Sequence, residues 1–278
     1  MPSDDRPVEQ ITRTHADSHS DGLFCVIAAS NDEDCLKRNL LSSEMIRSGR
    51  VPLHVERGAL SAAQAYNSGL DATRAPIVIF AHQDTYFPPG WDKTLGQALD
   101  VLQELDRSWA LLAPFGISVD DWRLAFGPVW SSSLGQVIGH MPEGFQPVQS
   151  FDELAFVMRR DAGLRFDEGL PGFHLHGLDM AQSAWTQGLG AYVTALPLVH
   201  NDVFHGVLRR DFSEAYHYLR RKWRHRLPLY SPVLRLSRHG LDLPLQRLRM
   251  LWSFKKRRRL SLDSHRPGQH YSRACNWE

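Results

Sequence analysis

Apolar runs typical of buried strands alternate with helical patterns along the first hundred residues. Residues 23–30 (LFCVIAAS) form a continuous apolar run, typical of a strand buried on both faces. Residues 33–46 repeat leucine and methionine at helical spacing, and residues 51–57 predict a second strand. Another helix is expected over 62–72, before a β-branched run at 75–82. This order predicts an α/β fold with a mostly parallel central sheet flanked by helices.

The pattern becomes less regular after this run. Residues 117–149 show no clear period and predict loops. A polar, glycine-punctuated loop is expected before a helix that begins near Asp179. The other expected elements are a helix from Pro88-Pro89-Gly90 to about Leu105 and strands over 108–116, 150–161 and 191–200.

The composition is that of an ordinary globular protein. Hydrophobic residues make up 42% and charged residues 23% of the 278 residues, which excludes a fibrous or wholly disordered chain. Cys25, Cys35 and Cys275 are too few for a disulfide scaffold. No apolar run approaches the roughly 20 residues of a membrane span, and the start MPSDDRPVEQ lacks a basic region followed by an apolar one. We therefore expect a cytoplasmic protein.

Charge divides the chain unevenly, although its formal net charge is only +1. Residues 1–21 are expected to be a disordered polar tail, 22–205 the main domain and 206–278 a basic, mainly helical extension. An amphipathic helix over 212–226 and the cluster FKKRRR at 254–259 carry the positive charge. A solvated basic face explains them, as does peripheral contact with an anionic membrane or a phosphate-bearing acceptor. Nucleic acid is disfavoured because the aromatic residues form no recognised motif.

Candidate chemistry begins where the buried strand at 75–82 ends. Ligands of open α/β sheets bind outside the carboxyl ends of the strands, so His82, Gln83 and Asp84 are expected to face a site. Asp84 can supply a hard oxygen ligand to Mg²⁺ or Mn²⁺. It can also cap the helix that follows Pro88-Pro89, and the position at a strand end favours the metal.

Three separated stretches share the order of motifs in a known family. They are AYNSGLDATRAPIVIFAHQD at 65–84, RFDEGLPGFHLHGLDMAQSAWTQGLGAYV at 165–193, and VHND at 199–202. In this order they resemble the family 2 glycosyltransferases, more narrowly the StrF-like transferases whose acidic motif reads His-Gln-Asp. The resemblance spans most of residues 22–205 and implies a GT-A-like fold.

The resemblance also implies an activity and roles for individual residues. It implies inverting transfer of a sugar from a nucleoside-diphosphate sugar to a hydroxyl acceptor, with Mn²⁺ or Mg²⁺ held by Asp84 and His200. Asp179, at a helix start, takes the place of the catalytic base. His174 and His176 lie on the acceptor side, and the acceptor can be a glycan, a lipid-linked sugar or a small molecule. The donor side comprises Ser30, Asn31, Asn67, His82, Gln83 and Asp84.

Two departures from the family pattern concern the donor side. The first Asp of the usual Asp-x-Asp is His82, and no clear Asp ends the second strand at residues 56–58, so the base-recognition contact is not identified. A non-catalytic nucleotide-sugar or nucleic-acid binding module on the same scaffold is therefore an alternative function.

The same residues can also be explained without a transferase activity. Asp179 and Asn31 are equally explained as helix caps. His174 and His176 are two apart, as in zinc sites, but no third ligand has convincing spacing, which favours an ordinary hydrogen-bonded or acceptor-lining pair. A zinc hydrolase built on these two histidines and His200 is a further alternative.

Overall fold

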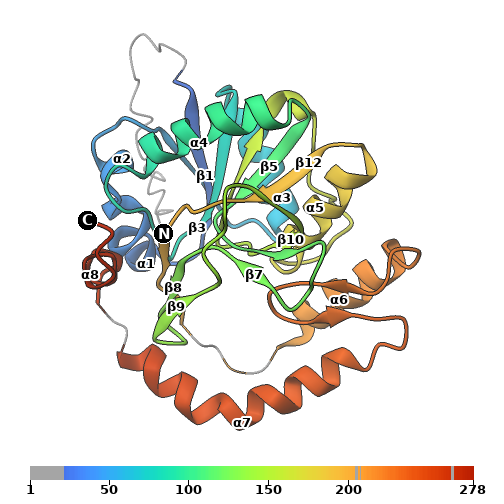
Figure 1. The fold of residues 1–278 in the computed structure, drawn as a ribbon. Helices are drawn as coiled ribbons and strands as arrows, with labels where there is room; N and C mark the ends of the chain where they lie inside the picture. The colour runs from blue at the N-terminus through green and yellow to red at the C-terminus, as the bar shows by residue number, and fades with distance from the viewer. Residues whose placement is uncertain (1–21, 204–205, 207, 264–265) are drawn as a thin grey trace, which may run out of the picture.

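The computed structural model describes residues 22–203, 206, 208–263 and 266–278. The predicted tail over residues 1–21 lies outside the described residues. The core is a nine-stranded sheet in the order β2-β1-β3-β11-β5-β12-β10-β6-β7 (Figure 1). Its strands are β1 (Phe24–Ser30), β2 (Leu53–Arg57), β3 (Ile77–His82), β5 (Trp109–Ala113), β6 (Gly116–Ser118), β7 (Ala125–Phe126), β10 (Gln146–Phe151), β11 (Ala155–Arg159) and β12 (Gly190–Val193).

The sheet confirms the predicted α/β class and is mixed in direction. β1 pairs in parallel with both β2 and β3, and β5 pairs in parallel with β12. β11 lies antiparallel between β3 and β5, while β10 is antiparallel to β12 and β6, and β7 to β6. Consequently β2, β1, β3, β5, β12 and β6 all point the same way, so their carboxyl ends lie at one edge.

Short strands account for the main differences from the sequence prediction. The predicted loop over 117–149 contains β7, β8 (Val129–Ser131) and β9 (Gln136–Ile138), and the predicted strands over 150–161 and 191–200 are each interrupted. β8 and β9 join β4 (Thr85–Tyr86) and β13 (Leu198–His200) in a four-stranded sheet ordered β4-β13-β8-β9. Strands of two or three residues are too short to show a period, and their pairing partners are distant in sequence.

The predicted helix over 33–46 is wrong as one continuous element. The structure divides it into α1 (Glu33–Arg38), a 3-10 turn at Leu40–Ser42 and α2 (Glu44–Arg47). The break falls at Asn39, whose side-chain Nδ2 donates to the carbonyl of Cys35 at 3.0 Å and whose φ of −117° is not helical. Asparagine side chains compete in this way with regular helical hydrogen bonding.

Helices cover both faces of the sheet. Alternate residues of β1 face opposite layers: Cys25 and Ile27 pack with α3 (Ala62–Ala72) and α5 (His176–Thr186), whereas Val26 and Ala28 pack with α1 and α4 (Trp91–Leu105). Figure 1 shows α4 crossing the front of the sheet and α3 and α5 behind it. The predicted helices over 62–72 and 88–105 are confirmed, while the helix expected near Asp179 begins three residues earlier, at His176.

The extension after residue 205 is packed against the main body. It contains α6 (Arg210–Lys222), the hairpin β14 (Leu229–Tyr230) and β15 (Arg235–Leu236), α7 (Asp242–Asp263) and α8 (Gly268–Ala274). Leu175 and Leu178 of the main domain share an apolar cluster with Phe212 and Leu243 of the extension. None of the described helices is long and apolar enough to cross a membrane.

Candidate active site

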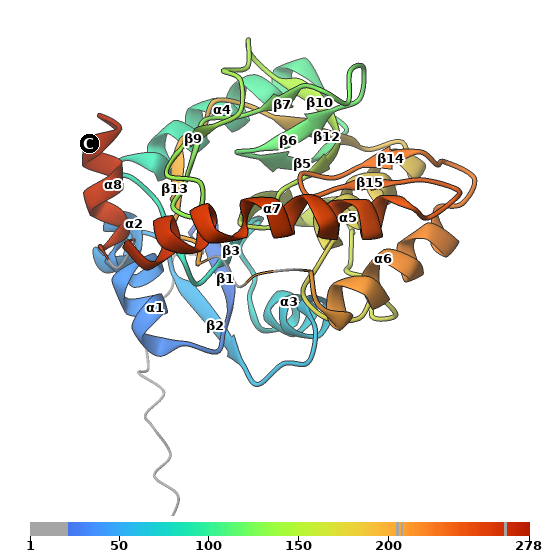
Figure 2. The same cartoon turned by 90° about the horizontal axis from the view of Figure 1, so that it is seen from below.

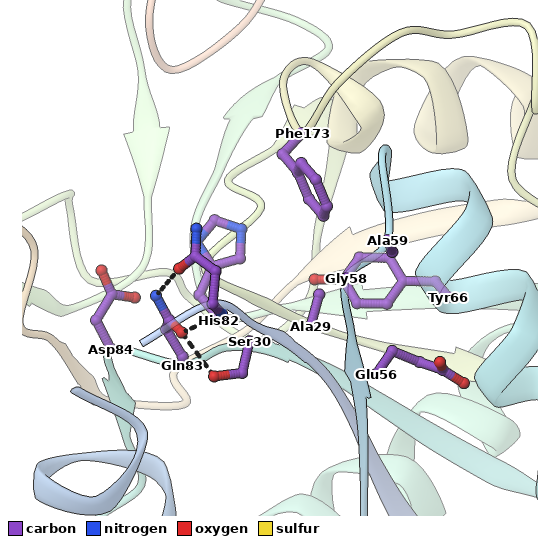
Figure 3. Close-up of a pocket in the computed structure, with 11 residues that line it drawn as sticks. Ala29, Ser30, Glu56, Gly58, Ala59, Tyr66, His82, Gln83, Asp84 and Phe173 are labelled. Carbon is purple, nitrogen blue, oxygen red and sulfur yellow. Dashed lines mark hydrogen bonds between the residues drawn. The ribbon is translucent and has the colours of Figure 1, made fainter. Parts of the chain in front are cut away.

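A cavity opens where the parallel strands β1, β2 and β3 end. Their register aligns Ser30 with Arg57 and Ala29 with His82, so the three carboxyl ends lie side by side. The cavity has a volume of 230 Å³. Figure 3 shows its lining residues, which are Ala29, Ser30, Asn31, Glu56, Gly58, Ala59, Tyr66, His82, Gln83, Asp84 and Phe173.

Gln83 fixes the position of the loop after β1, which lines this cavity. Its Oε1 accepts hydrogen bonds from Ser30 Oγ at 2.8 Å and from the backbone N–H groups of Asn31 and Asp32, each at 3.0 Å. Its Nε2 donates to Asn31 Oδ1 at 2.8 Å (Figure 3). Gln83, one of the predicted donor-side residues, therefore joins the end of β3 to the loop after β1. Its carboxamide has few hydrogen-bonding positions left for a ligand.

His82, Asp84 and His200 converge beside the cavity. One ligand-type atom from each residue lies within 4.8 Å of the other two. The pairing of β13 with β4 places His200 opposite Thr85, and the Asn201 N–H donates to the Asp84 carbonyl at 2.9 Å. The sequence predicted Asp84 and His200 as ligands, and the structure brings them together and adds His82.

This trio has the chemistry of a divalent-cation site. Asp84 Oδ1 is buried and makes no hydrogen bond with the described residues, although it lies 3.5 Å from His200 Nε2. A buried carboxylate oxygen without a hydrogen bond is costly unless another positive partner is supplied. One carboxylate and two imidazoles suit Mn²⁺ and related transition metals better than Mg²⁺, which prefers oxygen ligands. The residues present therefore fit a cation bound by Asp84, His200 and His82.

Electrostatics hold Asp84 and His200 as an ion pair in the absence of a metal. Burial alone would raise the pKa of Asp84, but the charge of His200 lowers it to about 2. Burial alone would lower the pKa of His200, but Asp84 and Asp202 raise it to about 10. Burial lowers the pKa of His82, which is therefore neutral at pH 7 and ready to donate a lone pair.

The segment after β13 fixes His200 in place. Asn201 donates through Nδ2 to Asn39 Oδ1 and to the Arg266 carbonyl, both at 2.9 Å, and accepts from Ser132 Oγ at 2.7 Å. Asp202 accepts from the backbone N–H of Ser133 at 3.0 Å. Asn201 and Asp202, the last two residues of VHND, thus anchor the metal-type cluster of His82, Asp84 and His200 and add no ligand to it.

Binding of Mn²⁺ is expected to release about one proton per ion at pH 7, because the cation displaces the proton of His200 while Asp84 and His82 have none to lose. Calorimetric titration of Mn²⁺ in buffers of different ionisation enthalpy measures this proton directly. His174→Gln should release the same proton as the wild type. A binding heat that does not depend on the buffer would contradict the pairing of Asp84 with a charged His200.

Two cavity residues, Glu56 and Phe173, were not predicted from the sequence. Glu56 of β2 lines the cavity and holds His54 Nε2 at 2.7 Å, so an acid does occupy the strand end that lacked a clear Asp. The sequence signal for Glu56 is its position at the carboxyl end of a predicted parallel strand, where ligands of such sheets bind. Tyr66 and Phe173 add aromatic surface, which suits stacking with a base or sugar.

Asn67 lies outside the cavity lining. Its buried side chain exchanges two hydrogen bonds with the backbone of Phe166, each at 3.0 Å, and donates to Glu168 Oε1 at 3.1 Å. It therefore braces the loop before α5. The prediction that it belongs to the donor side has no support from these contacts.

His174 and His176 diverge. His174 Nε2 faces Asp211 Oδ2 of α6 at 3.3 Å, whereas His176 is buried among aromatic rings with no hydrogen-bond partner for either nitrogen among the described residues. Burial keeps the pKa of His176 well below its ordinary value. The metal-type cluster contains His200 but neither of these histidines, so it gives no support to a zinc site formed by all three.

Asp179 is turned toward the extension. Its carboxylate accepts from Trp223 Nε1 at 2.8 Å and pairs with Lys222 Nζ at 2.8 Å, and it is only 2% exposed. It does not line the cavity. Its assignment as catalytic base stays a prediction, and these contacts favour a role in holding α5 against α6.

Asp179→Asn is expected to lower the free energy of unfolding by about 1–3 kcal/mol, because it breaks a buried ion pair whose lysine is partly exposed and keeps Asp167 as a partner. Urea denaturation measures this loss. Asp71→Asn, which breaks the exposed pair with Arg165, is the matched control and should leave the free energy of unfolding nearly unchanged. Unchanged stability would contradict the structural role.

A second carboxylate, Glu153, lies in the turn before β11, and this turn is hydrogen-bonded to the backbone of His82. The carbonyl of its neighbour Leu154 accepts from the His82 N–H and from Thr85 Oγ1, each at 2.8 Å, which fixes the turn before β11 against the residues flanking Asp84. Glu153 Oε1 accepts from the Gly177 N–H at 3.3 Å, at the start of α5. The sequence offered no signal for it, since the segment 150–161 was expected to be one strand.

Glu153 has the electrostatic environment of a proton acceptor. Burial and then the charge of Asp152 raise its pKa to about 8. The raised pKa of Tyr66, in the cavity wall, arises first from burial and then from the charges of Glu153 and Asp84. The charges of both carboxylates therefore reach Tyr66. A carboxylate with a pKa near neutral is well suited to general base catalysis.

Comparisons with known proteins give distant likenesses. No protein-family model matches the chain. Over 165 residues it is 29% identical to "ATP synthase subunits region ORF 6" of Fuscovulum blasticum, a match that covers 55% of this chain and 63% of that protein. The chain thus spans less than two thirds of the curated relative that it matches.

Solved structures with a similar arrangement include a mannosyltransferase and two proteins bound to a nucleotide or a nucleotide sugar. The mannosyltransferase PcManGT of Pyrobaculum calidifontis, in complex with GDP-Man and Mn²⁺, is 13% identical with a TM-score of 0.43, covering 87% of this chain and 73% of that one. GalNAc-T7 with UDP, GalNAc and Mn²⁺ is 12% identical with a TM-score of 0.45, covering 90% and 59%. TarS of S. aureus with UDP-GlcNAc is 12% identical with a TM-score of 0.42, covering 70% and 65%. Sequence identities and TM-scores this low do not identify a function, which has to come from the residues of the site.

Proposed function

We propose that this chain is a GT-A-like, StrF-like glycosyltransferase that moves a sugar from a nucleoside-diphosphate sugar to a hydroxyl acceptor with inversion. The observation that carries the proposal is the cluster of Asp84, His82 and His200 at the carboxyl edge of the sheet, next to a cavity with polar and aromatic walls. A cation site beside a cavity of this kind suits a substrate that contains both a diphosphate and a nucleoside.

The donor is assigned to the cavity residues according to their chemistry. Asp84, His200 and His82 would hold Mn²⁺, which neutralises charge on the departing diphosphate as a Lewis acid. Ser30 and Glu56 supply hydrogen-bonding groups for a ribose or base, and Tyr66 and Phe173 supply rings for stacking. Gln83 keeps the loop at Asn31 in position, so its contribution to donor binding is indirect.

Glu153 is our candidate for the catalytic base. Its carboxylate would take the proton of the acceptor hydroxyl as that oxygen forms a bond to the anomeric carbon, while the bond from this carbon to the diphosphate breaks on the opposite face. The raised pKa of Glu153 and the hydrogen bond that joins its turn to the backbone of His82 support this role, and the contacts of Asp179 with Lys222 and Trp223 make Asp179 the weaker candidate.

The main domain and the extension have different roles at this site. Residues 22–205 supply all of the proposed donor contacts, and residues 206–278 cover the side of the molecule toward which Asp179 and His174 point. The extension is therefore proposed to shape the acceptor side. The cytoplasmic location and the nature of the acceptor stay predictions.

A non-catalytic nucleotide-sugar binding module is the second candidate, favoured by the use of His82 where an Asp is usual. One experiment separates the two functions. Thermal unfolding is followed with a panel of nucleoside-diphosphate sugars with and without Mn²⁺, because a ligand that binds the native state raises its stability. Hydrolysis of the stabilising donor is then measured. A transferase should release nucleoside diphosphate slowly, whereas a binding module should stabilise with the donor and release none.

A further inference from the structure

Helix α7 carries two faces of different character. One face holds the helix to the protein: Leu243 and Met250 are buried, Gln246 Nε2 donates to the Val233 carbonyl at 2.9 Å, and Arg247 Nε donates to the Leu208 carbonyl at 3.0 Å. Further along, Arg257 Nη2 donates to Ser133 Oγ at 2.9 Å. These positions recur every three or four residues and so lie on one side of the helix.

The opposite face of α7 and the residue before it expose large apolar side chains. Trp252 is 87% exposed, a fraction that the packing of a single chain does not explain. Positions 241, 245, 248 and 252 follow the spacing of one helical face. The other exposed apolar residues of this stripe are Leu241, Leu245, Leu248 and Leu251, which are between 51% and 60% exposed. Contiguous exposed apolar surface of this kind marks an interaction site.

Positive charge accompanies the apolar stripe. Arg249, Lys255, Lys256 and Arg259 are exposed on the same helix. Between Asp242 and Asp263 the sequence contains no acidic residue. A helix with leucine and tryptophan next to exposed lysine and arginine is typical of segments that lie in the interface of an anionic bilayer.

The position of α7 relates this surface to the candidate active site. In Figure 1 the helix runs below the lower ends of the strands, and Figure 2, seen from below, shows it crossing in front of β1 and β3. Its contact Ser133 is hydrogen-bonded through its N–H to Asp202, two residues after His200. The outward face of α7 therefore lies on the side of the molecule at which the parallel strands end.

We propose that the exposed face of α7 binds the surface of an anionic phospholipid bilayer and holds the carboxyl edge of the sheet toward it. The apolar stripe would enter the boundary between headgroups and acyl chains, and the basic residues would contact the headgroups. The binding surface stands independently of the proposed transferase activity. Taken with that activity, it identifies the acceptor class as a lipid-linked one.

Charge complementarity favours a bilayer over the other occupants of such a face. A nucleic acid would use the basic residues but would leave five exposed apolar side chains in water. A second copy of this chain could cover the apolar stripe with its own α7, but between Asp242 and Asp263 it would bring no acidic residue to pair with the basic ones.

Sedimentation with vesicles tests the proposal without donor or metal. The full chain, in EDTA, is mixed with vesicles of phosphatidylcholine alone or with about one third phosphatidylglycerol, and we expect binding that needs the anionic lipid and weakens with salt. Trp252→Ser with Leu248→Ser, and separately Lys255→Glu with Lys256→Glu, should each lower the partition coefficient about tenfold or more. These side chains are exposed, so the fold should survive, and circular dichroism checks this.

Matched controls place the same chemical changes elsewhere. Leu60 is 84% exposed, and Leu60→Ser should leave vesicle binding unchanged, as should Lys37→Glu with Lys93→Glu, two exposed lysines of α1 and α4. No binding to anionic vesicles, or binding that the α7 variants do not reduce, would overturn the proposal. So would a dimer in light scattering that the Trp252→Ser, Leu248→Ser variant abolishes, because the face would then be a self-association surface.

Discussion

Asp84→Asn is expected to lower Mn²⁺-dependent donor binding and sugar transfer by about 100-fold or more, because the amide keeps the size of the side chain but loses the charge that attracts the cation. The fold should survive, since the backbone carbonyl of residue 84 still accepts from Asn201. Equilibrium titration of the donor with Mn²⁺, followed by a transfer assay, measures both effects.

Asp32→Asn is the matched control for this substitution. Asp32 lies next to the loop held by Gln83 and caps α1 by accepting from the Cys35 N–H at 2.9 Å. Asparagine caps a helix about as well as aspartate, so this variant should behave like the wild type. If Asp84→Asn bound the donor with unchanged affinity in Mn²⁺, Asp84 would have no part in holding the metal.

Glu153→Gln is expected to lower single-turnover transfer by about 10²–10⁴-fold while donor binding stays intact, because the amide cannot take the proton of the acceptor. In the wild type the rate should fall as the pH drops below the raised pKa of Glu153, which burial and Asp152 shift to about 8. This acidic limb should be absent from the residual activity of the variant. Transfer at saturating donor across the pH range gives both readings.

Comparing Asp179→Asn with Glu153→Gln decides which of the two carboxylates is the catalytic base. Both acids lie near the start of α5, and each substitution removes one carboxylate. We expect Asp179→Asn to lose stability and to keep near-normal turnover per folded molecule. The opposite pattern, with normal turnover in Glu153→Gln and a large loss in Asp179→Asn, would return the role of base to Asp179.

The sequence predicted the parts of the site that lie on continuous, buried elements. The run ending at His82 identified β3 and placed Asp84 at the carboxyl edge, because apolar runs of this length form buried parallel strands. The register of β1 with β3 then brings Ser30 to the same edge. These positions depend on local pattern, which a single sequence contains.

Other parts of the site depend on contacts between distant segments. Asp179 lies in the first turn of α5, close to the predicted helix start, but the direction of its side chain is decided by Lys222 and Trp223 at the end of α6, 43 and 44 residues away. His82 departs from the usual Asp-x-Asp pattern, but the pairing of β4 with β13 brings His200 close to it and makes His82 a third member of the cluster. Glu153 lies in a turn between two short strands, and no period identifies such a turn.

The most direct test of the proposed site is calorimetric binding of nucleoside diphosphates, with UDP and GDP first, in the presence of Mn²⁺ and in EDTA. We predict that one of them binds the wild type with Mn²⁺, that affinity falls about 100-fold or more in EDTA, and that Asp84→Asn in Mn²⁺ resembles the wild type in EDTA. Affinity that is the same with and without the metal, or the same in Asp84→Asn, would contradict a donor held through a cation at Asp84.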